Sequence, residues 1–268
     1  MTMETVAEFG MVKLGFADGV AEVVLDAPKK LNVLNEQGLD DLSACLRAAG
    51  ELDGVRALLL RGEGRGFCAG RDVSAVDPAT DDVAGYLEGR MGPLMQLLSS
   101  FPAPTFCAVQ GPCLGVGLGL AIACDVVYVA DDAKLGSPFV NLGAVLDSGG
   151  HALFVERLGV HRTLDLIYTG ELVSGAELVR GGVFSRSVPA DELLDFTRRT
   201  IQKVAQGPTQ ALLASKRLVR RIEAEQLGLW DVLTVENEEQ ARLAAHDDYR
   251  EGFRAFQEKR KPSFTGEA

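Results

Sequence analysis

The chain has 268 residues, of which 47% are hydrophobic and 24% are charged, and this composition excludes a disordered or fibrous protein. Lysine and arginine number 27 against 38 aspartates and glutamates, so the formal net charge is −11. Because a chain this acidic repels phosphate backbones, nucleic acid is not expected as its main partner. An anionic ligand would need a local cluster of basic side chains.

The cysteines and the N-terminus point to a cytoplasmic protein. The five cysteines are odd in number and widely spaced, no Cys-x-x-Cys occurs, and there are only three histidines. We therefore expect buried, reduced thiols and no metal site. The first ten residues carry acids and no apolar core, so no signal peptide is expected. Residues 91–124 are uncharged, but prolines interrupt them, and we expect no membrane span.

The first half of the chain alternates predicted strands and helices. Two apolar runs around Asp18-Gly19 predict a hairpin, since Asp-Gly favours tight turns. Apolar periodicity places strands over 12–17, 20–25, 57–60, 105–109 and 125–130, and helices over 36–49 and 83–98.

Beyond Gly149, helical periodicity dominates from 152 to 252, with a short strand near 183–188. Gly207-Pro208 and Gly228 separate the helices. The class predicted is α/β with a helical C-terminal portion, and the domain boundary is placed at 200, giving regions 1–200 and 201–268.

Two Gly-rich turns follow buried strands. Gly115, Gly117 and Gly119 resemble a dinucleotide fingerprint only weakly, because the third glycine comes one place early. Close packing of a helix on the sheet is the simpler reading, and a third is that free N–H groups at this helix mouth hold an oxyanion. The turn Phe67–Asp72 exposes backbone donors in the same way.

A third segment, Leu146–His151, contains the side chain that we single out. No G-x-S-x-G motif surrounds Ser148, which argues against a serine nucleophile. Either Asp147 or Ser148 would serve as the N-cap of the next helix. Alternatively, Asp147 beside Val145 and Leu146 is poorly solvated, which would raise its pKa toward that of a working base.

Taken together, several blocks of the sequence resemble the crotonase (enoyl-CoA hydratase/isomerase) superfamily. They are LDAPKKLNVLN, RGFCAGRDV, AVQGPCLGVGLGLAIACDVVYVADDAKLGSP, GAVLDSGG and FQEKRKPSFTG, and they run in that family's order over nearly the whole chain. The resemblance implies a spiral of ββα turns that carries an acyl-CoA site. It also implies a helical C-terminal trimerisation region, a homotrimer or dimer of trimers, and no cofactor beyond the CoA of the substrate.

The family's functional positions transfer residue by residue. The resemblance makes the backbone N–H groups of Arg71 and Val116 the oxyanion hole. The two catalytic glutamates of the hydratases are replaced here by Gly119 and Phe139. Adding water needs groups that orient and deprotonate it, so this departure argues against ordinary hydratase activity.

Asp147 matches an aspartate of the isomerases in that family. Together with Phe139 and the C-terminal segment, it looks most like the phenylacetate-pathway ring-1,2-epoxyphenylacetyl-CoA isomerase group. The resemblance therefore implies that Asp147 is the acid and base of a proton shift, with an acyl pocket shaped by Phe139, Tyr86 and Leu146. Phe139 and Val145, with Leu146, are expected to form an apolar wall that keeps water out.

Basic residues are needed for coenzyme A despite the net charge. By resemblance, Lys29, Lys30 and Ala69 contact it, with Lys259 and Lys261 reaching the 3′-phosphate, sometimes from a neighbouring subunit. Arg65 is a further candidate.

Four readings remain open at this point. An isomerase is favoured; a hydratase, hydrolase or dehalogenase would gain support if an acid such as Glu88 entered the pocket. A catalytically silent acyl-CoA-binding trimer and a nicotinamide dehydrogenase are the others.

Overall fold

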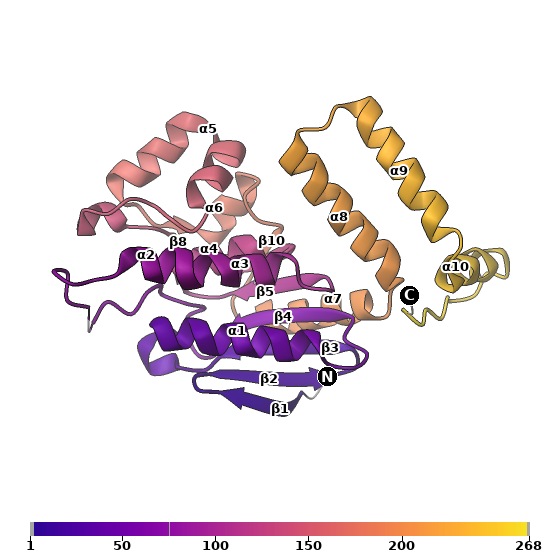
Figure 1. The fold of residues 1–268 in the computed structure, drawn as a ribbon, viewed down its shortest axis with the longest axis horizontal. Coiled ribbons are helices and arrows are strands. Elements are labelled where there is room, and N and C mark those ends of the chain that lie inside the picture. Colours follow the sequence, from indigo (N-terminus) through magenta and orange to yellow (C-terminus); the bar gives the residue numbers. More distant parts are fainter. Residues whose placement is uncertain (1–2, 75, 267–268) are drawn as a thin grey trace.

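A seven-stranded sheet forms the centre of the molecule, in the order β1-β2-β3-β4-β5-β7-β10 (Figure 1). The computed structural model describes residues 3–74 and 76–266. β1, β2 and β3 are antiparallel, whereas each later neighbour pairs in parallel. A second sheet has the order β6-β8-β9. The strands are β1 (Glu4–Phe9), β2 (Val12–Ala17), β3 (Val20–Leu25), β4 (Ala57–Gly62), β5 (Thr105–Val109), β6 (Pro112–Leu114), β7 (Val126–Ala130), β8 (Lys134–Gly136), β9 (Val173–Ser174) and β10 (Arg186–Val188).

Helices cover the sheet and build the C-terminal part. α1 begins after Asn35, whose side chain accepts a hydrogen bond from the Gly38 N–H, and it buries an apolar stripe that includes Leu39, Leu42 and Leu46. The helical segments are η1 (Pro28–Lys30), α1 (Glu36–Gly50), α2 (Val83–Tyr86), η2 (Leu87–Met91), α3 (Gly92–Ser99), α4 (Val116–Ala123), η3 (Phe139–Leu142), α5 (Gly150–Thr169), α6 (Gly175–Arg180), α7 (Leu193–Ala205), α8 (Thr209–Glu225), α9 (Leu229–Leu243) and α10 (Asp247–Gln257).

The parallel strands β3 and β5 are buried on both faces because helices lie on both sides of the sheet. Every residue of β3 and of β5 is buried. In parallel strands the carboxyl ends meet at one edge of the sheet, and ligands commonly bind there. The loops after β3, β4 and β5 therefore come together at one edge, and they contain the two Gly-rich turns that the sequence singled out; the Leu146–His151 segment instead lies between η3 and the start of α5.

The predicted strands and helices of the first half are confirmed, with two differences. β1, β6, β8 and β9 were not predicted, because β1 is an exposed edge strand and the others have only two or three residues. The helix expected over 83–98 is divided into α2, a π-helical turn η2 and α3.

The domain boundary expected at residue 200 falls inside α7. This helix packs on β3, β4, β5 and β7, and it buries Ile201 and Ala205. The next helix, α8, runs beside α9 (Figure 1), and the division of the chain at residue 200 stays a prediction. The large apolar side chains Leu229, Trp230 and Phe256 are 68%, 77% and 85% exposed in the single chain. Among the described residues, no helix has the length and hydropathy to cross a bilayer.

Candidate active site

The loop after β4 is held from both sides by backbone hydrogen bonds. The Leu34 N–H donates to the Gly70 carbonyl (2.9 Å) and the Asp72 N–H donates to the Leu34 carbonyl (3.0 Å). This is the pattern of a parallel bridge, in which the central residue, Arg71, turns its own N–H away from the partner strand. On the other side, the Leu114 N–H donates to the Cys68 carbonyl at 3.0 Å.

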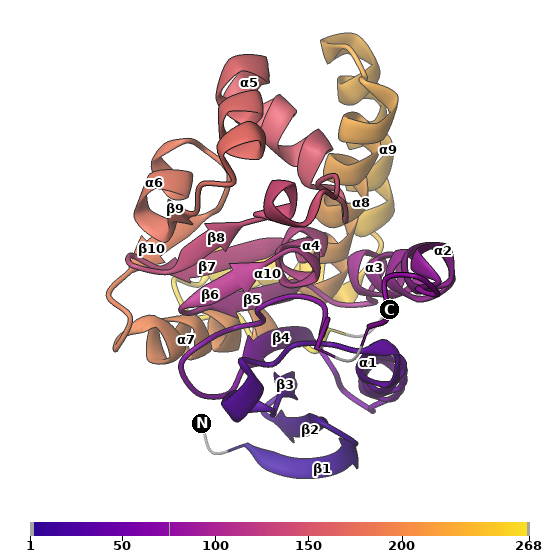
Figure 2. The same ribbon diagram turned by 90° about the vertical axis from the view of Figure 1, so that its left-hand side faces the viewer.

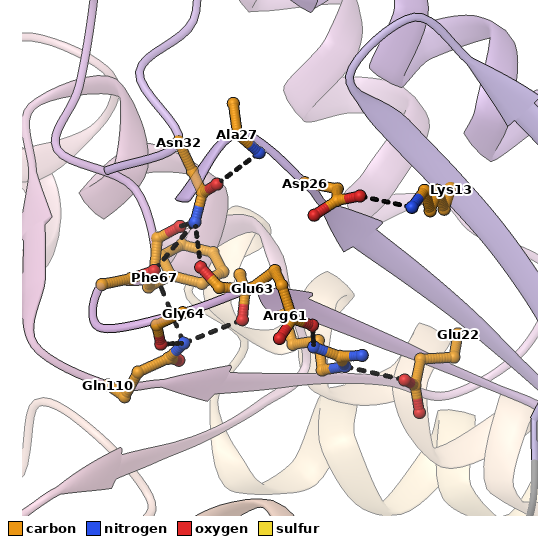
Figure 3. Close-up of polar contacts among 12 residues, drawn as sticks. Lys13, Glu22, Asp26, Ala27, Asn32, Arg61, Glu63, Gly64, Phe67 and Gln110 are labelled. Atoms are coloured by element: carbon orange, nitrogen blue, oxygen red, sulfur yellow. Dashed lines mark hydrogen bonds and ion pairs between the residues drawn. The ribbon is translucent and has the colours of Figure 1, made fainter. Parts of the chain in front are cut away.

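Asn32 clamps the start of this loop, as Figure 3 shows. Its amide nitrogen lies 2.9–3.1 Å from the carbonyl oxygens of Glu63, Gly66 and Phe67, and its Oδ1 accepts from the Ala27 N–H at 2.8 Å. The side chain is fully buried and the backbone is left-handed, with φ of 56°. Sequence reasoning missed this role. The available signal was an asparagine soon after Pro28 in a turn, since Asn tolerates the left-handed region better than most residues.

The Gly-rich turn brings the start of α4 against the same loop. A Cβ on Gly117 would lie 2.3 Å from the Cys68 carbonyl oxygen, so only glycine allows this approach. A Cβ placed on Gly70 would lie 3.9 Å from the Val116 nitrogen. Val116 is the first residue of α4, whose first-turn N–H groups lack intrahelical acceptors. Among the described residues, neither the Arg71 nor the Val116 N–H donates a hydrogen bond.

Asp147 lies in the turn before α5, and it does not cap that helix. The N-cap of α5 is Gly149, with no side-chain cap hydrogen bond, so the expectation that Asp147 or Ser148 caps this helix is wrong. The Ser148 hydroxyl instead donates to Asp147 Oδ1 at 2.8 Å. Burial raises the pKa of the Asp147 carboxyl, an effect that the Ser148 hydrogen bond and the positive charge of Arg71 only partly offset.

The Arg71 side chain contacts one acidic side chain and one aromatic ring. Its Nη1 and Nη2 donate to the two carboxylate oxygens of Asp81 at 2.8 and 2.6 Å, and the guanidinium lies 4.1 Å from the centre of the Tyr86 ring. Tyr86 is buried and its hydroxyl donates to the Leu34 carbonyl at 3.0 Å. Tyr86 therefore packs beneath the Arg71 guanidinium, and its place in the acyl pocket stays a prediction.

No space is available for a side chain at position 119. A Cβ on Gly119 would stand 2.5 Å from Ser148 Cβ and 3.0 Å from Met91 Cε. At the second position, the Phe139 ring lies against Gly115, because a Cβ there would be 2.8 Å from Phe139 Cζ. Glu88 on η2 is exposed.

The apolar wall expected beside Asp147 is only partly present. Leu146 is buried and packs on Gly150, but Val145 is 70% exposed. Val145 therefore needs correction as a wall residue. The physical reason is that residues 140–145, from η3 into the following loop, run along the surface.

The basic residues expected at coenzyme A form two separate groups. Lys29 and Lys30 are exposed on η1, and Lys30 Nζ lies 3.0 Å from Asp72 Oδ2, next to Arg71. Ala69 follows in the same loop, and its N–H donates to the Leu31 carbonyl at 2.9 Å. Arg65 is also exposed there.

Lys259 and Lys261 are exposed beyond α10. α10 lies at the opposite end of the molecule from α2 (Figure 1). Figure 2 is viewed from the α2 end and shows α10 behind the sheet. That Lys259 and Lys261 contact coenzyme A stays a prediction.

A large cavity lies elsewhere among the described residues. It has a volume of about 1080 Å³ between α5, α8 and the sheet, with Ile122, Leu153, Phe184 and Leu212 among its lining residues. Arg71, Val116 and Asp147 do not line it. The described residues contain no group of three or more His, Cys, Asp or Glu side chains placed to hold a metal ion.

Comparison with known proteins decides the family. The family model for enoyl-CoA hydratase/isomerase matches residues 15–267. The chain belongs to the enoyl-CoA hydratase/isomerase family. It is 34% identical to the 1,2-epoxyphenylacetyl-CoA isomerase of Escherichia coli over 92% of this chain and 95% of that protein. It is also 30% identical to the 2,3-dehydroadipyl-CoA hydratase of the same organism, over 91% and 94%.

Solved structures of the family superpose over almost the full length of the chain. The enoyl-CoA hydratase of Bacillus anthracis gives a TM-score of 0.87 at 27% identity, covering 96% of this chain and 100% of that one. The crotonase fold expected from the resemblance is therefore confirmed, including the C-terminal helices. The relatives of this family member include a protein named as an isomerase and a protein named as a hydratase.

Proposed function

We propose that this family member is an acyl-CoA isomerase that moves a proton, and with it a double bond, within a CoA thioester. The observation that carries the proposal is the environment of Asp147: it is one half-buried carboxyl whose pKa is raised by burial, and the next residue, Ser148, packs against Gly119 of α4. A raised pKa suits a group that must both accept and donate a proton near neutral pH.

The proposed reaction needs one carboxylate. Asp147 takes a proton from an acidic carbon of the acyl chain, and the electron pair moves onto the thioester oxygen as an enolate. The N–H groups of Arg71 and Val116 hold that oxygen, and loss of one such donor typically lowers the rate about 10²–10³-fold. Asp147 then returns the proton to another carbon, so no atom is gained or lost. The reaction therefore requires no cofactor beyond the CoA that the substrate carries.

Two features of the site favour isomerisation over hydration. Position 119 has no side chain and no room for one, and position 139 is a phenylalanine packed on Gly115. A hydratase needs groups that orient and deprotonate a water molecule. The hydrophobic ring of Phe139 and the buried Leu146 instead limit water around Asp147.

The rest of the proposal concerns the substrate and the assembly. Lys29 and Lys30 are exposed beside the Arg71 loop and would bind the CoA phosphates there. Lys259 and Lys261 would reach the site of a neighbouring subunit in a homotrimer or a dimer of trimers. The exposed apolar side chains of α9 and α10 support such an assembly, because monomers rarely leave residues such as Trp230 and Phe256 in water.

A panel of enoyl-CoA and aryl-CoA thioesters in D₂O tests the proposal. An isomerase leaves the product with the substrate's mass apart from incorporated deuterium, whereas a hydratase adds water. Asp147→Asn should abolish turnover while acyl-CoA still binds, as measured by calorimetry. Turnover at the native rate by this variant, or a hydrated product from the native enzyme, would overturn the proposal.

A further inference from the structure

We propose that Ser148 positions the carboxylate of Asp147. Ser148 occupies the volume that a side chain at position 119 would otherwise fill. This inference rests on the proposed function, since it assigns a partner to the proposed acid and base. It starts from the hydrogen bond that the Ser148 hydroxyl donates to Asp147 Oδ1 at 2.8 Å.

The backbone around Ser148 is strained for a serine. Ser148 has φ of 52° and Gly149 has φ of 80°, and the Gly150 N–H donates to the Asp147 carbonyl at 3.0 Å. Two consecutive left-handed residues closed by this bond form a type I′ turn, which favours Asn, Asp or Gly at its first central position. Serine there is unfavourable for the backbone, and strain retained at a site points to a function.

Packing against α4 fixes the position of the turn. The Ser148 Cβ and carbonyl oxygen would lie 2.5 and 3.2 Å from a Cβ at Gly119, and Met91 Cε completes the contact at 3.0 Å. Leu146 anchors the other side, because its methyl groups lie 2.8–3.0 Å from where a Cβ of Gly150 would stand. The hydroxyl that faces Asp147 is therefore carried by a turn wedged between α4 and α5.

Besides Ser148, two groups on other elements act on the Asp147 carboxyl. The positively charged Arg71, in the loop after β4, lowers its pKa. Tyr86 on α2 also interacts with it electrostatically, and that phenol stays neutral because burial raises its pKa well above the usual value. Asp81 acts indirectly, through its ion pair with Arg71. Ser148 is the one neutral donor among these groups with a hydrogen bond to the carboxylate in the described structure.

The hydroxyl has two separable effects. It orients the carboxylate toward the substrate, and it favours the charged form of Asp147. Ser148→Ala should therefore lower the plateau of kcat roughly 10- to 100-fold through misplacement of the base. It should also move the acid limb of the pH–rate profile to higher pH, because the carboxyl loses a donor that favours its ionised form.

The experiment measures kcat and kcat/KM against pH for the native enzyme, Ser148→Ala and Ser148→Gly, with a CoA thioester on which the native enzyme is active. Glycine relieves the left-handed backbone but lacks the hydroxyl, so both variants should show the same shift of the acid limb. Gly119→Ala, which pushes on Ser148 from α4, should lower the plateau as well. Ser137→Ala is the matched control, since the buried Ser137 hydroxyl has no hydrogen-bond partner among the described residues. Its acid limb should stay at the native pH.

The outcomes separate this inference from the proposed function. If Asp147→Asn is inactive but Ser148→Ala keeps the native plateau and acid limb, Ser148 has no positioning role and only this inference fails. If Ser148→Ala lowers the plateau with an unmoved acid limb, the residue is merely structural and the inference also fails. If Asp147→Asn is active, the proposed function itself fails.

Discussion

Asn32 offers the sharpest test of how the fold supports the site. Replacing it by alanine removes the acceptor of the Ala27 N–H and the donor shared by the carbonyls of Glu63, Gly66 and Phe67. An amide carries two hydrogens, so three bonds are lost in effect, at about 1 kcal/mol each. Alanine at φ of 56° adds about 1 kcal/mol of backbone strain. The free energy of unfolding should therefore fall by about 4 kcal/mol.

Urea unfolding at a fixed protein concentration measures this loss. Asn35→Ala is the matched control, because it removes a single part-buried cap hydrogen bond and should cost about 1 kcal/mol. Asn32→Gly keeps the hydrogen-bond loss but not the strain, so it should be about 1 kcal/mol less destabilising than Asn32→Ala. The reasoning is refuted if Asn32→Ala costs no more than Asn35→Ala.

Three further predictions concern charge. Glu22 is buried between Arg61 and Arg198 at 2.6–3.0 Å; burial alone would raise the pKa of Glu22, but hydrogen bonds from Arg198 and Arg61 outweigh it and the folded pKa is lowered. The stability that the Glu22 ion pairs contribute should disappear as the pH falls through that lowered pKa. At neutral pH, Glu22→Gln should lower the free energy of unfolding by about 3–5 kcal/mol. A melting temperature that does not change across a pH series would contradict this. The pKa of Asp147 is raised in the folded protein, so its charge costs stability once the pH exceeds that pKa. Asp147→Asn should therefore melt no lower than the native protein at pH 7. A lower melting temperature for this variant would count against the raised pKa. Asp81→Asn removes the acid that pairs with Arg71, so the Arg71 charge should lower the pKa of Asp147 further. The acid limb of the pH–rate profile should then move to lower pH, opposite to the effect of Ser148→Ala. An acid limb that stays in place would show that Arg71 does not act on Asp147.

Much of the fold follows from local patterns in the sequence. The hairpin around Asp18-Gly19 and the buried strands β4 and β5 are encoded by turn residues and apolar runs a few residues long. The same holds for the helix that begins at Asn35, where the cap and the apolar stripe agree. The family, too, was recognisable from motifs, since those motifs are contiguous.

The arrangement of the site depended on contacts between distant segments. Asn32 binds carbonyls 31–35 residues away, Tyr86 donates to a carbonyl 52 residues away, and Gly119 meets Ser148. No periodicity or spacing specifies such pairs, because each depends on how neighbouring strands and helices are registered in three dimensions.

The turn at Asp147 shows the division most clearly. Composition and order provided an aspartate among apolar residues, which allowed both a helix cap and a buried base. Only the packing of the Leu146–Gly150 turn between α4 and α5 decided between them, because it gives the N-cap position to Gly149 and leaves the carboxylate with the Ser148 hydroxyl. The environment of a side chain consists of the residues that surround it in the folded protein. Those residues come together only when segments far apart in the sequence have packed against one another.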